Sequence, residues 1–440
     1  MDKMTRNISE LSEEKVYKKI IWRIMPLAIF AYILTYFDRI NISFAKTQMQ
    51  NEIGLTDAAY GIAASMFFIG YVLFEVPSAI GLKKYGAVRW ISRILISLGV
   101  VTSCLVFAYD QYTLYILRFL IGVMEAGFGP AVLFYLACWF PKKYLARING
   151  LWFIAVPLSG AIGSPIAGLI LNSLNGTLGM LGWHWLFIIT GIPCIILGLV
   201  FLFVLSDKAE QAKWLNEEEK KLVIKNLELD KATRKNTSVS SWWRVLFTRE
   251  VAIFSFIYFA IKSAAYGLNF WMPQIVEKSG IKDAFYIGLL TSLPYIVACI
   301  GMLVVTRMSD RTGNRKSYLL LCMLSAAIGY TMLCTLENNI YLMLFSLIVA
   351  TSGSFIVIPI FWTLPQSKFE GIAVASGTAA INSLGQLSGM VAPIIIGFIA
   401  EHTGSHQLGL LSILPLLIIS CIFITKTIKN PVLKLESSKA

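Results

Sequence analysis

Ionisable side chains stand inside stretches of this sequence that are otherwise apolar. They are Asp38, Arg39, Glu75, Arg118, Glu125 and Lys262. Such residues usually face the interior of a helix bundle or a water-filled cavity, because lipid cannot hydrate them. Burial raises the pKa of a carboxyl group, whereas a nearby guanidinium lowers it. A carboxyl that alternates between these surroundings can take up and release a proton near physiological pH. These residue types therefore allow proton transfer and anion binding.

The sequence offers little of what an enzyme or a metal site needs. It contains no HExxH, GxSxG or Walker-type stretch, and its three His, at 184, 402 and 406, lie at the outer boundaries of apolar segments. All seven Cys lie in apolar segments without CxxC spacing, at 104, 138, 194, 299, 322, 334 and 421. Small packing residues are favoured over a zinc site or disulfides. We expect no enzyme, no metal and no cofactor. A non-transporting receptor is the rival class, but no sizeable soluble output domain is present.

The segments that carry these charges are predicted to be membrane-spanning helices. Hydrophobic residues make up 57% of the chain, charged residues 14%, and the mean hydropathy is +0.69, far outside the soluble range. Runs such as LPLLIISCIFI do not alternate as barrel strands would. Apolar runs of about 20 residues predict an all-α integral membrane protein with helices at 20–43, 57–82, 88–108, 111–136, 144–171, 183–205, 250–275, 284–306, 317–336, 339–363, 370–400 and 407–427.

The basic residues predict the orientation. Of the 38 Lys and Arg, 32 lie in the N-terminal stretch, alternate loops and the C-terminal tail. The opposite loops hold Lys46, Lys278 and Lys282. Because basic residues are retained on the cytoplasmic side, we expect both termini to be cytoplasmic. The net charge of +13 is thus dispersed over the cytoplasmic segments, and it does not indicate nucleic-acid binding.

Repeated sequence motifs predict that the chain consists of two similar halves. LSG at 158–160 precedes Gly168 as LSG at 387–389 precedes Gly397, and KYGAVR resembles RTGNRK; the two offsets are 229 and 227 residues. Such repeats are common in transporters. We predict a cytoplasmic tail at 1–19, six-helix halves at 20–205 and 250–427, a cytoplasmic linker at 206–249 and a second tail at 428–440.

The predicted linker contains NEEEKKLVIKNLEL, in which Asn216 and Glu219 have the spacing of a capping box. The stretch is either a short amphipathic helix on the cytoplasmic surface or a solvated connection between the halves.

Depth estimates suggest which charges meet. If the first helix ends near Ser43, Asp38 lies about 8 Å below the outer surface, and Arg118 lies about 10 Å below it on the fourth helix. The two can therefore pair, which leaves Arg39 free for an anion. Glu125, two turns after Arg118 on nearly the same face, lies about 21 Å deep. It either exchanges a proton or stays permanently paired and only locks helices together.

Lys262 lies about 18 Å into the seventh helix, too deep to reach the surface easily. It either neutralises a substrate carboxylate or pairs structurally with Glu75. Asn382 and Gln386, polar and one turn apart on a helix rich in small residues, suit a cavity wall.

Four of these stretches resemble a known family. SDRTGNRK (309–316) resembles the loop signature of the major facilitator superfamily, although its first-half counterpart GLKKYGAVRW lacks the acidic residue. YFDRINISFA (36–45), RFLIGVMEAGFGP (118–130) and WLNEEEK (214–220) resemble the anion:cation symporter family within that superfamily. NGLWFIAVPLSGAIGSPIAG and FWMPQI are similar to the bacterial branch that includes tartrate, phthalate and 4-hydroxyphenylacetate permeases.

The resemblance implies a twelve-helix alternating-access carrier that imports organic anions with protons. Asp38 and Glu125 would be the coupling carboxylates, with Arg118 as their switchable partner. The substrate cavity would be lined by Arg39, Tyr36, Tyr71 and Asn382, to which our own inference adds Lys262. The gating loop would comprise Asp310, Arg311, Gly313 and Arg315.

We therefore expect proton-coupled symport of a small organic carboxylate, either aromatic or a hydroxy or dicarboxylic acid. The aromatic option is favoured by YGLNFWMP (266–273) and PIFWTLP (359–365). An exporter or anion exchanger on the same fold is the alternative. The expected partners are the anion, protons and the lipid bilayer, without nucleic acid. We expect a monomer in the bacterial inner membrane, driven by the proton gradient.

Overall fold

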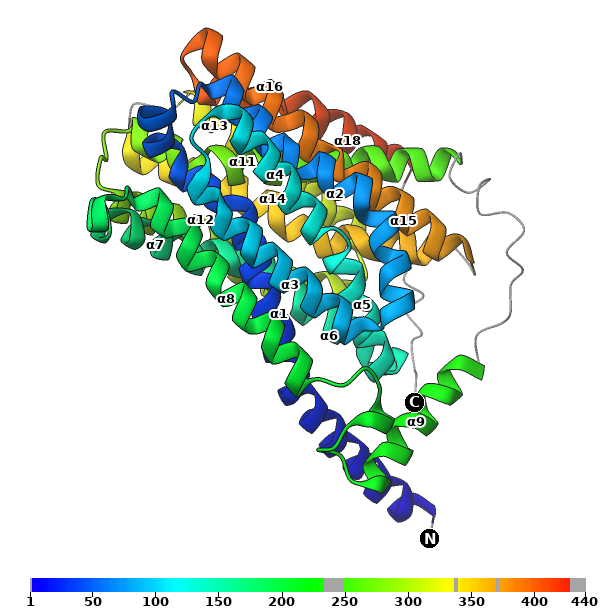
Figure 1. The fold of residues 1–440 in the computed structure, drawn as a ribbon. Coiled ribbons are helices and arrows are strands. Elements are labelled where there is room, and N and C mark those ends of the chain that lie inside the picture. Colours follow the sequence, from blue (N-terminus) through cyan, green and yellow to red (C-terminus); the bar gives the residue numbers. More distant parts are fainter. Residues whose placement is uncertain (1, 233–247, 336–338, 369–371, 428–440) are drawn as a thin grey trace.

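The computed structural model describes residues 2–232, 248–335, 339–368 and 372–427 (Figure 1). Every regular element in these ranges is a helix, which confirms the predicted all-α class. Twelve helical stretches among them are long and apolar enough to cross a membrane, as predicted. The predicted tail at 428–440 and the linker residues 233–247 lie outside the described part.

The first half of the chain contains α1 (Asp2–Ile53), α2 (Asp57–Tyr85), α3 (Ala87–Cys104), α4 (Gln111–Glu125), α5 (Phe128–Trp139), α6 (Lys142–Phe153), α7 (Ala155–Ser173) and α8 (Gly182–Val204). The helix α9 (Glu217–Ala232) follows. The second half contains α11 (Arg249–Lys278), α12 (Ala284–Thr312), α13 (Arg315–Thr335), α14 (Ile340–Lys368), α15 (Ile372–Gln386), α16 (Ser388–Thr403), α17 (His406–Leu411) and α18 (Leu414–Thr427). Short 3-10 turns lie at Leu105–Phe107, Thr177–Gly179 and Ala209–Gln211.

The N-terminal end of α1 and α9 lie at one end of the bundle, here called the α9 end (Figure 1). The opposite end, here called the far end, carries the turn between α1 and α2 at Gly54 and the turn between α16 and α17 at Gly404. Helix α1 continues to Ile53, ten residues beyond the predicted end at Ser43. Asp38 is therefore about 22 Å from the end of its helix, not about 8 Å. Lys46, predicted to lie in a loop, is inside α1.

The fourth predicted span is broken at its middle into α4 and α5. Gly127 has φ +78°, in the left-handed region that glycine adopts without strain. A side chain there would also collide with the hydroxyl of Ser78 on α2. The break places Glu125 at the last position of α4, deep in the bundle.

The two halves meet through close backbone contacts at positions that are equivalent in the internal repeat. A Cβ atom on Gly168 of α7 would collide with the carbonyl of Ala284, the first residue of α12. A Cβ on Gly397 of α16 would collide in the same way with the carbonyl of Asp57, the first residue of α2. Figure 1 shows α2 beside α16 and α12 beside α7. Repeat-related glycines thus make repeat-related contacts, as small residues allow between membrane helices.

The capping box predicted for the central stretch is confirmed. The Asn216 N–H donates to Glu219 Oε2 over 2.9 Å, and the Glu219 N–H donates to Asn216 Oδ1 over 2.7 Å. Lys19 Nζ lies 2.8 Å from the same carboxylate and ties α9 to α1. Partial burial alone would raise the pKa of Glu219, but the hydrogen bonds from Lys19 and Asn216 hold it below its usual value. The stretch is therefore a docked helix.

Candidate functional site

A buried ion pair joins α1 to α4 at the centre of the bundle. Arg39 Nε donates to Glu125 Oε1 over 2.7 Å, and Arg39 Nη2 donates to the same oxygen. The Arg39 side chain is 6% exposed and that of Glu125 is fully buried. Among the described residues nothing donates to Glu125 Oε2. This oxygen is an acceptor that a proton or a donor group would satisfy, because a buried polar atom without a partner is costly.

The pairing that we predicted from depth is wrong. Arg118 donates to the backbone carbonyls of Asp38 and Arg39, over 3.3 and 3.5 Å, and not to a side-chain carboxylate. Arg39, expected to be free, holds Glu125 instead. Arg118 does lie at the level of Asp38, but the Asp38 carboxylate is directed at Asn41, Thr102 and Cys194 instead. The pairing was wrong because depth along a helix does not give the rotation of the helix. Arg118 fixes the α1 backbone at the level of the site.

Asp38 is a buried carboxylate whose hydrogen-bond partners are uncharged. Asn41 Nδ2 and Thr102 Oγ1 each lie 3.2 Å from its oxygens, and Cys194 Sγ lies at 3.5 Å. In the described part of the chain no Lys, Arg or His nitrogen lies within 4.0 Å of its carboxylate oxygens, and Arg118 contacts only its backbone carbonyl. A proton on Asp38 would remove a buried charge that no cation contacts directly.

Aromatic rings surround the Arg39 guanidinium. Its carbon lies 5.7 Å from the ring centre of Tyr36, 5.3 Å from that of Phe67 and 5.2 Å from that of Tyr71. Cation–π contacts of this kind stabilise a cation in an apolar site. Two of the three rings, Tyr36 and Tyr71, belong to residues predicted to line the substrate cavity.

A polar chain continues from Tyr36 into the second half. Asn269 Nδ2 of α11 donates to the Tyr36 hydroxyl over 2.7 Å, and the Tyr295 hydroxyl of α12 donates to Asn269 Oδ1 over 2.7 Å. Asn269 and Tyr295 were not predicted to take part. Asn269 could have been recognised from the sequence, because it is a polar residue within the aromatic stretch YGLNFWMP. Only the rings of that stretch were considered.

Lys262 of α11 lies between two tyrosines. Its Nζ is 4.9 Å from the ring centre of Tyr266 and 5.8 Å from that of Tyr258, and the residue is 8% exposed. Arg39 is within electrostatic range of it, and the Tyr258 hydroxyl is its polar neighbour. No carboxylate among the described residues lies within 4.0 Å of this ammonium group. The Tyr266 hydroxyl donates to Gln386 Oε1 over 2.6 Å.

The alternative in which Lys262 pairs with Glu75 is therefore wrong. Glu75 of α2 accepts hydrogen bonds from Asn382 over 3.4 Å and from Ser383 over 3.3 Å, both on α15. Asn382 thus contacts the first half. Within the described ranges, Lys262 is left as a buried cation without a counter-ion.

The predicted gating loop lies at the turn between α12 and α13. Gly313 has φ +67° and ends α12 by donating its N–H to the Ser309 carbonyl. Arg315 Nη2 lies 3.9 Å from Asp310 Oδ1. Arg311 precedes this turn on an exposed stretch. The pair between Arg315 and Asp310 is solvent-exposed, so it contributes little to stability by itself.

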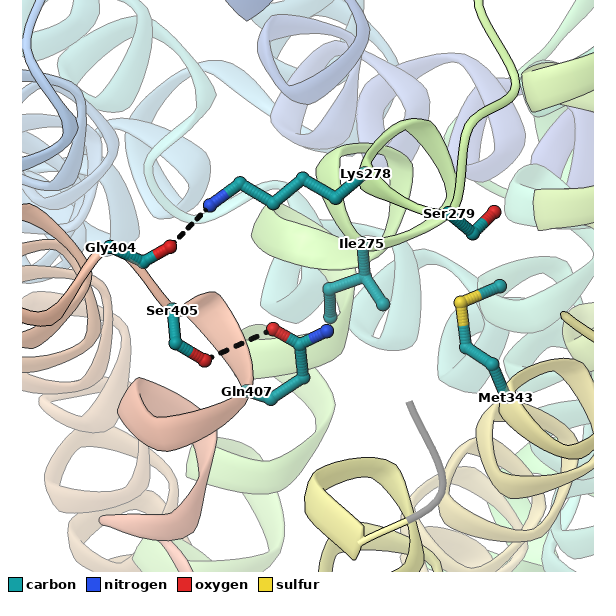
Figure 2. A pocket seen from close by; sticks show the side chains of 7 residues that line it. All are labelled: Ile275, Lys278, Ser279, Met343, Gly404, Ser405 and Gln407. Carbon is teal, nitrogen blue, oxygen red and sulfur yellow. Dashed lines mark hydrogen bonds between the residues drawn. The ribbon is translucent and has the colours of Figure 1, made fainter. Parts of the chain in front are cut away.

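A pocket of about 310 Å³ lies elsewhere, at the far end of the second half. Figure 2 shows Lys278 pointing toward the Gly404 carbonyl, 2.6 Å away, and the Ser405 hydroxyl directed at Gln407. Ile275, Ser279 and Met343 complete its lining. None of the residues around Arg39 takes part in it.

The Major Facilitator Superfamily model matches residues 28–393. The chain belongs to this superfamily. It is 38% identical over 410 residues to a protein of Agrobacterium vitis named "Putative tartrate transporter", covering 93% of this chain and 90% of that one. It is 36% identical to the quinolone resistance transporter of Acinetobacter baumannii, covering 90% of this chain and 91% of that one.

The xylose transporter XylE of E. coli, in a partially occluded inward-open conformation, has the same fold. The TM-score is 0.72 at 12% identity over 93% of this chain and 98% of that one. The protein is therefore a multi-pass membrane transporter of small molecules and not an enzyme.

Proposed function

We propose that the protein imports a small organic carboxylate together with protons by alternating access. The observation that carries this proposal is the buried pair of Arg39 and Glu125, in which one carboxylate oxygen has no donor. The similar protein of Agrobacterium vitis bears the name of a tartrate transporter, which makes tartrate the first substrate to test.

The pair links proton binding to anion binding. A proton on Glu125 cancels its negative charge and weakens its hold on Arg39. The guanidinium, still surrounded by aromatic rings, is then free to bind a substrate carboxylate. Loss of the proton restores the competing carboxylate and favours release of the anion. Arg118 acts in this scheme by positioning α1, and Asp38, which lacks a cation, is a second site for a proton.

Lys262 gives the second half its own contact with the anion. Lys262 belongs to α11 and interacts electrostatically with Arg39 of α1, so an anion that binds both cations would join the two halves. A substrate with two carboxylates satisfies both without a residual buried charge. Tyr36, Tyr71 and Asn382 would line the same path.

The expected cellular setting follows from the basic residues. Both termini would be cytoplasmic and the far end would face outward, in the inner membrane of a bacterium. The proton gradient would supply the energy without a cofactor, and we propose that a monomer suffices.

Export is the second candidate, because a relative of similar identity is named as a quinolone resistance transporter. Purified protein in liposomes distinguishes the two. With an acidic exterior, a symporter accumulates labelled tartrate inside, and a protonophore abolishes the accumulation. Proton-driven expulsion of a quinolone without carboxylate accumulation would establish the export alternative instead.

A further inference from the structure

A lysine, an aspartate and a histidine meet at the far end, away from the site around Arg39. Lys46 Nζ of α1 lies 2.5 Å from Oδ1 of Asp57, the first residue of α2. His406 Nε2, at the start of α17, lies 3.1 Å from Asp57 Oδ2 and 3.4 Å from Lys46 Nζ. Lys46 and Asp57 belong to the first half and His406 to the second. The cluster therefore bridges the halves.

The cluster is built into the interior. Lys46 is 1% exposed and His406 is 3% exposed. The Lys46 ammonium lies 4.3 Å from the ring centre of Trp271 and 5.0 Å from that of Tyr60, and these rings meet edge to face. A lysine buried so completely needs its counter-ion, because an unpaired charge in such a place is strongly destabilising.

Further contacts between the halves gather around the cluster. The Thr47 hydroxyl donates to Glu277 over 2.6 Å, and the Ala58 N–H donates to Glu401 over 2.7 Å. Gln274 donates to the Ser43 carbonyl. Toward the α9 end, Glu75 accepts hydrogen bonds from Asn382 and Ser383 across the halves. This arrangement closes the bundle at the far end.

We propose that Lys46, Asp57 and His406 form an outer latch that closes the substrate path at the far end and separates when the path opens there. Alternating access requires a second state in which the halves part at this end. In that state Lys46 and Asp57 stay together on the first half, while His406 and Trp271 leave with the second half. The latch can therefore open without stranding Lys46 as an unpaired charge. It serves import and export equally, so it does not depend on the proposed proton coupling.

Spin labels across the far end measure this opening directly. Leu178, after α7, and Tyr341, on α14, are 82% and 79% exposed and lie on different halves. Cysteines at these two positions, in a transport-competent background whose native Cys are replaced, give a distance distribution by pulsed EPR in lipid. We expect one short population in the parent. His406→Ala should add a longer population, increased several-fold over the parent.

His402→Ala is the matched control, because His402 is exposed and contacts the Phe398 carbonyl of its own helix. It should leave the distribution unchanged. His406→Gln retains a donor toward Asp57 and should restore much of the short population, which a nonspecific packing defect would not allow. The double variant Lys46→Met with Asp57→Asn removes the charged pair without leaving a lone charge, and it should also lengthen the distance. Identical distributions for the parent, His406→Ala and the double variant would overturn the proposal.

Discussion

At the residue scale, the central feature is the Arg39 guanidinium, for which two carboxylates compete in the proposed function. Arg39 pairs with Glu125 in the structure, and the proposed function requires it to bind a substrate carboxylate once Glu125 is protonated. Hydrogen bonds to charged groups contribute about 1.5–3 kcal/mol. The bonds from Arg39 to Glu125 and to a substrate carboxylate would thus be of comparable strength. Protonation of Glu125 would then favour binding of the substrate.

Replacing Arg39 tests its contact with the anion. We expect Arg39→Ala to weaken binding of the carboxylate by about ten- to a hundredfold, the equivalent of about 1.5–3 kcal/mol. Arg39→Lys should recover part of the affinity, since it keeps the charge but loses the planar fork. Substrate-dependent thermal shifts of the purified protein provide the measurement. An affinity unchanged in Arg39→Ala would remove this residue from the binding site.

In the proposed function, Lys262 favours anions with two carboxylates. We expect Lys262→Met to weaken binding of a dicarboxylate such as tartrate by about tenfold, through loss of one charged contact, and to change monocarboxylate binding little. Competition of both classes against labelled substrate measures the difference. Lys282→Met is the control, because Lys282 is exposed outside the spans. Equal losses for both classes of anion would indicate a structural role.

The charged residues of the site could be recognised from sequence, but their pairing could not. Asp38, Arg39, Arg118, Glu125 and Lys262 stand out because charge is rare in apolar segments, and the structure buries all of them. Which carboxylate meets which guanidinium depends on helix rotation and length to within a few ångströms. Neither quantity can be read from apolar runs, so Arg39 was left free and Arg118 was paired wrongly.

At the element scale, the break between α4 and α5 places Glu125. We expect Gly127→Ala to destabilise the protein by about 1–2 kcal/mol, because a left-handed conformation disfavours any Cβ atom and this one would also meet Ser78. Thermal unfolding in detergent measures the effect. Gly129→Ala is the matched control, since Gly129 is helical and its added Cβ would lie 3.8 Å from Trp152. Equal stability of the two variants would show that the break is not fixed by Gly127.

The helices themselves were largely predictable. Apolar length sets each span, and the capping box of Asn216 and Glu219 marked the start of α9 correctly. The length of α1 and the breaks within spans were not predicted. Polar residues such as Lys46 have the low hydropathy that is typical of loops. Lys46 can remain helical since Asp57 and Trp271 enclose its charge.

At the scale of the whole molecule, the proposed proton coupling and the proposed outer latch would be two parts of one cycle. The site around Arg39 lies between the halves, and the outer latch holds the halves together beyond it. A proton on Glu125 and a dicarboxylate shared by Arg39 and Lys262 would leave the site without a strong residual charge. The loaded carrier can then change its access more easily than a carrier with one unbalanced charge.

The most direct test of this account is the accumulation of substrate by Glu125→Gln in liposomes. Gln cannot exchange a proton, so we expect accumulation driven by a pH gradient to be abolished, while exchange of labelled for unlabelled carboxylate remains measurable. Glu228→Gln, on the exposed face of α9, should accumulate substrate like the parent. Normal gradient-driven accumulation by Glu125→Gln would contradict the proposal that this carboxylate couples the proton to the anion.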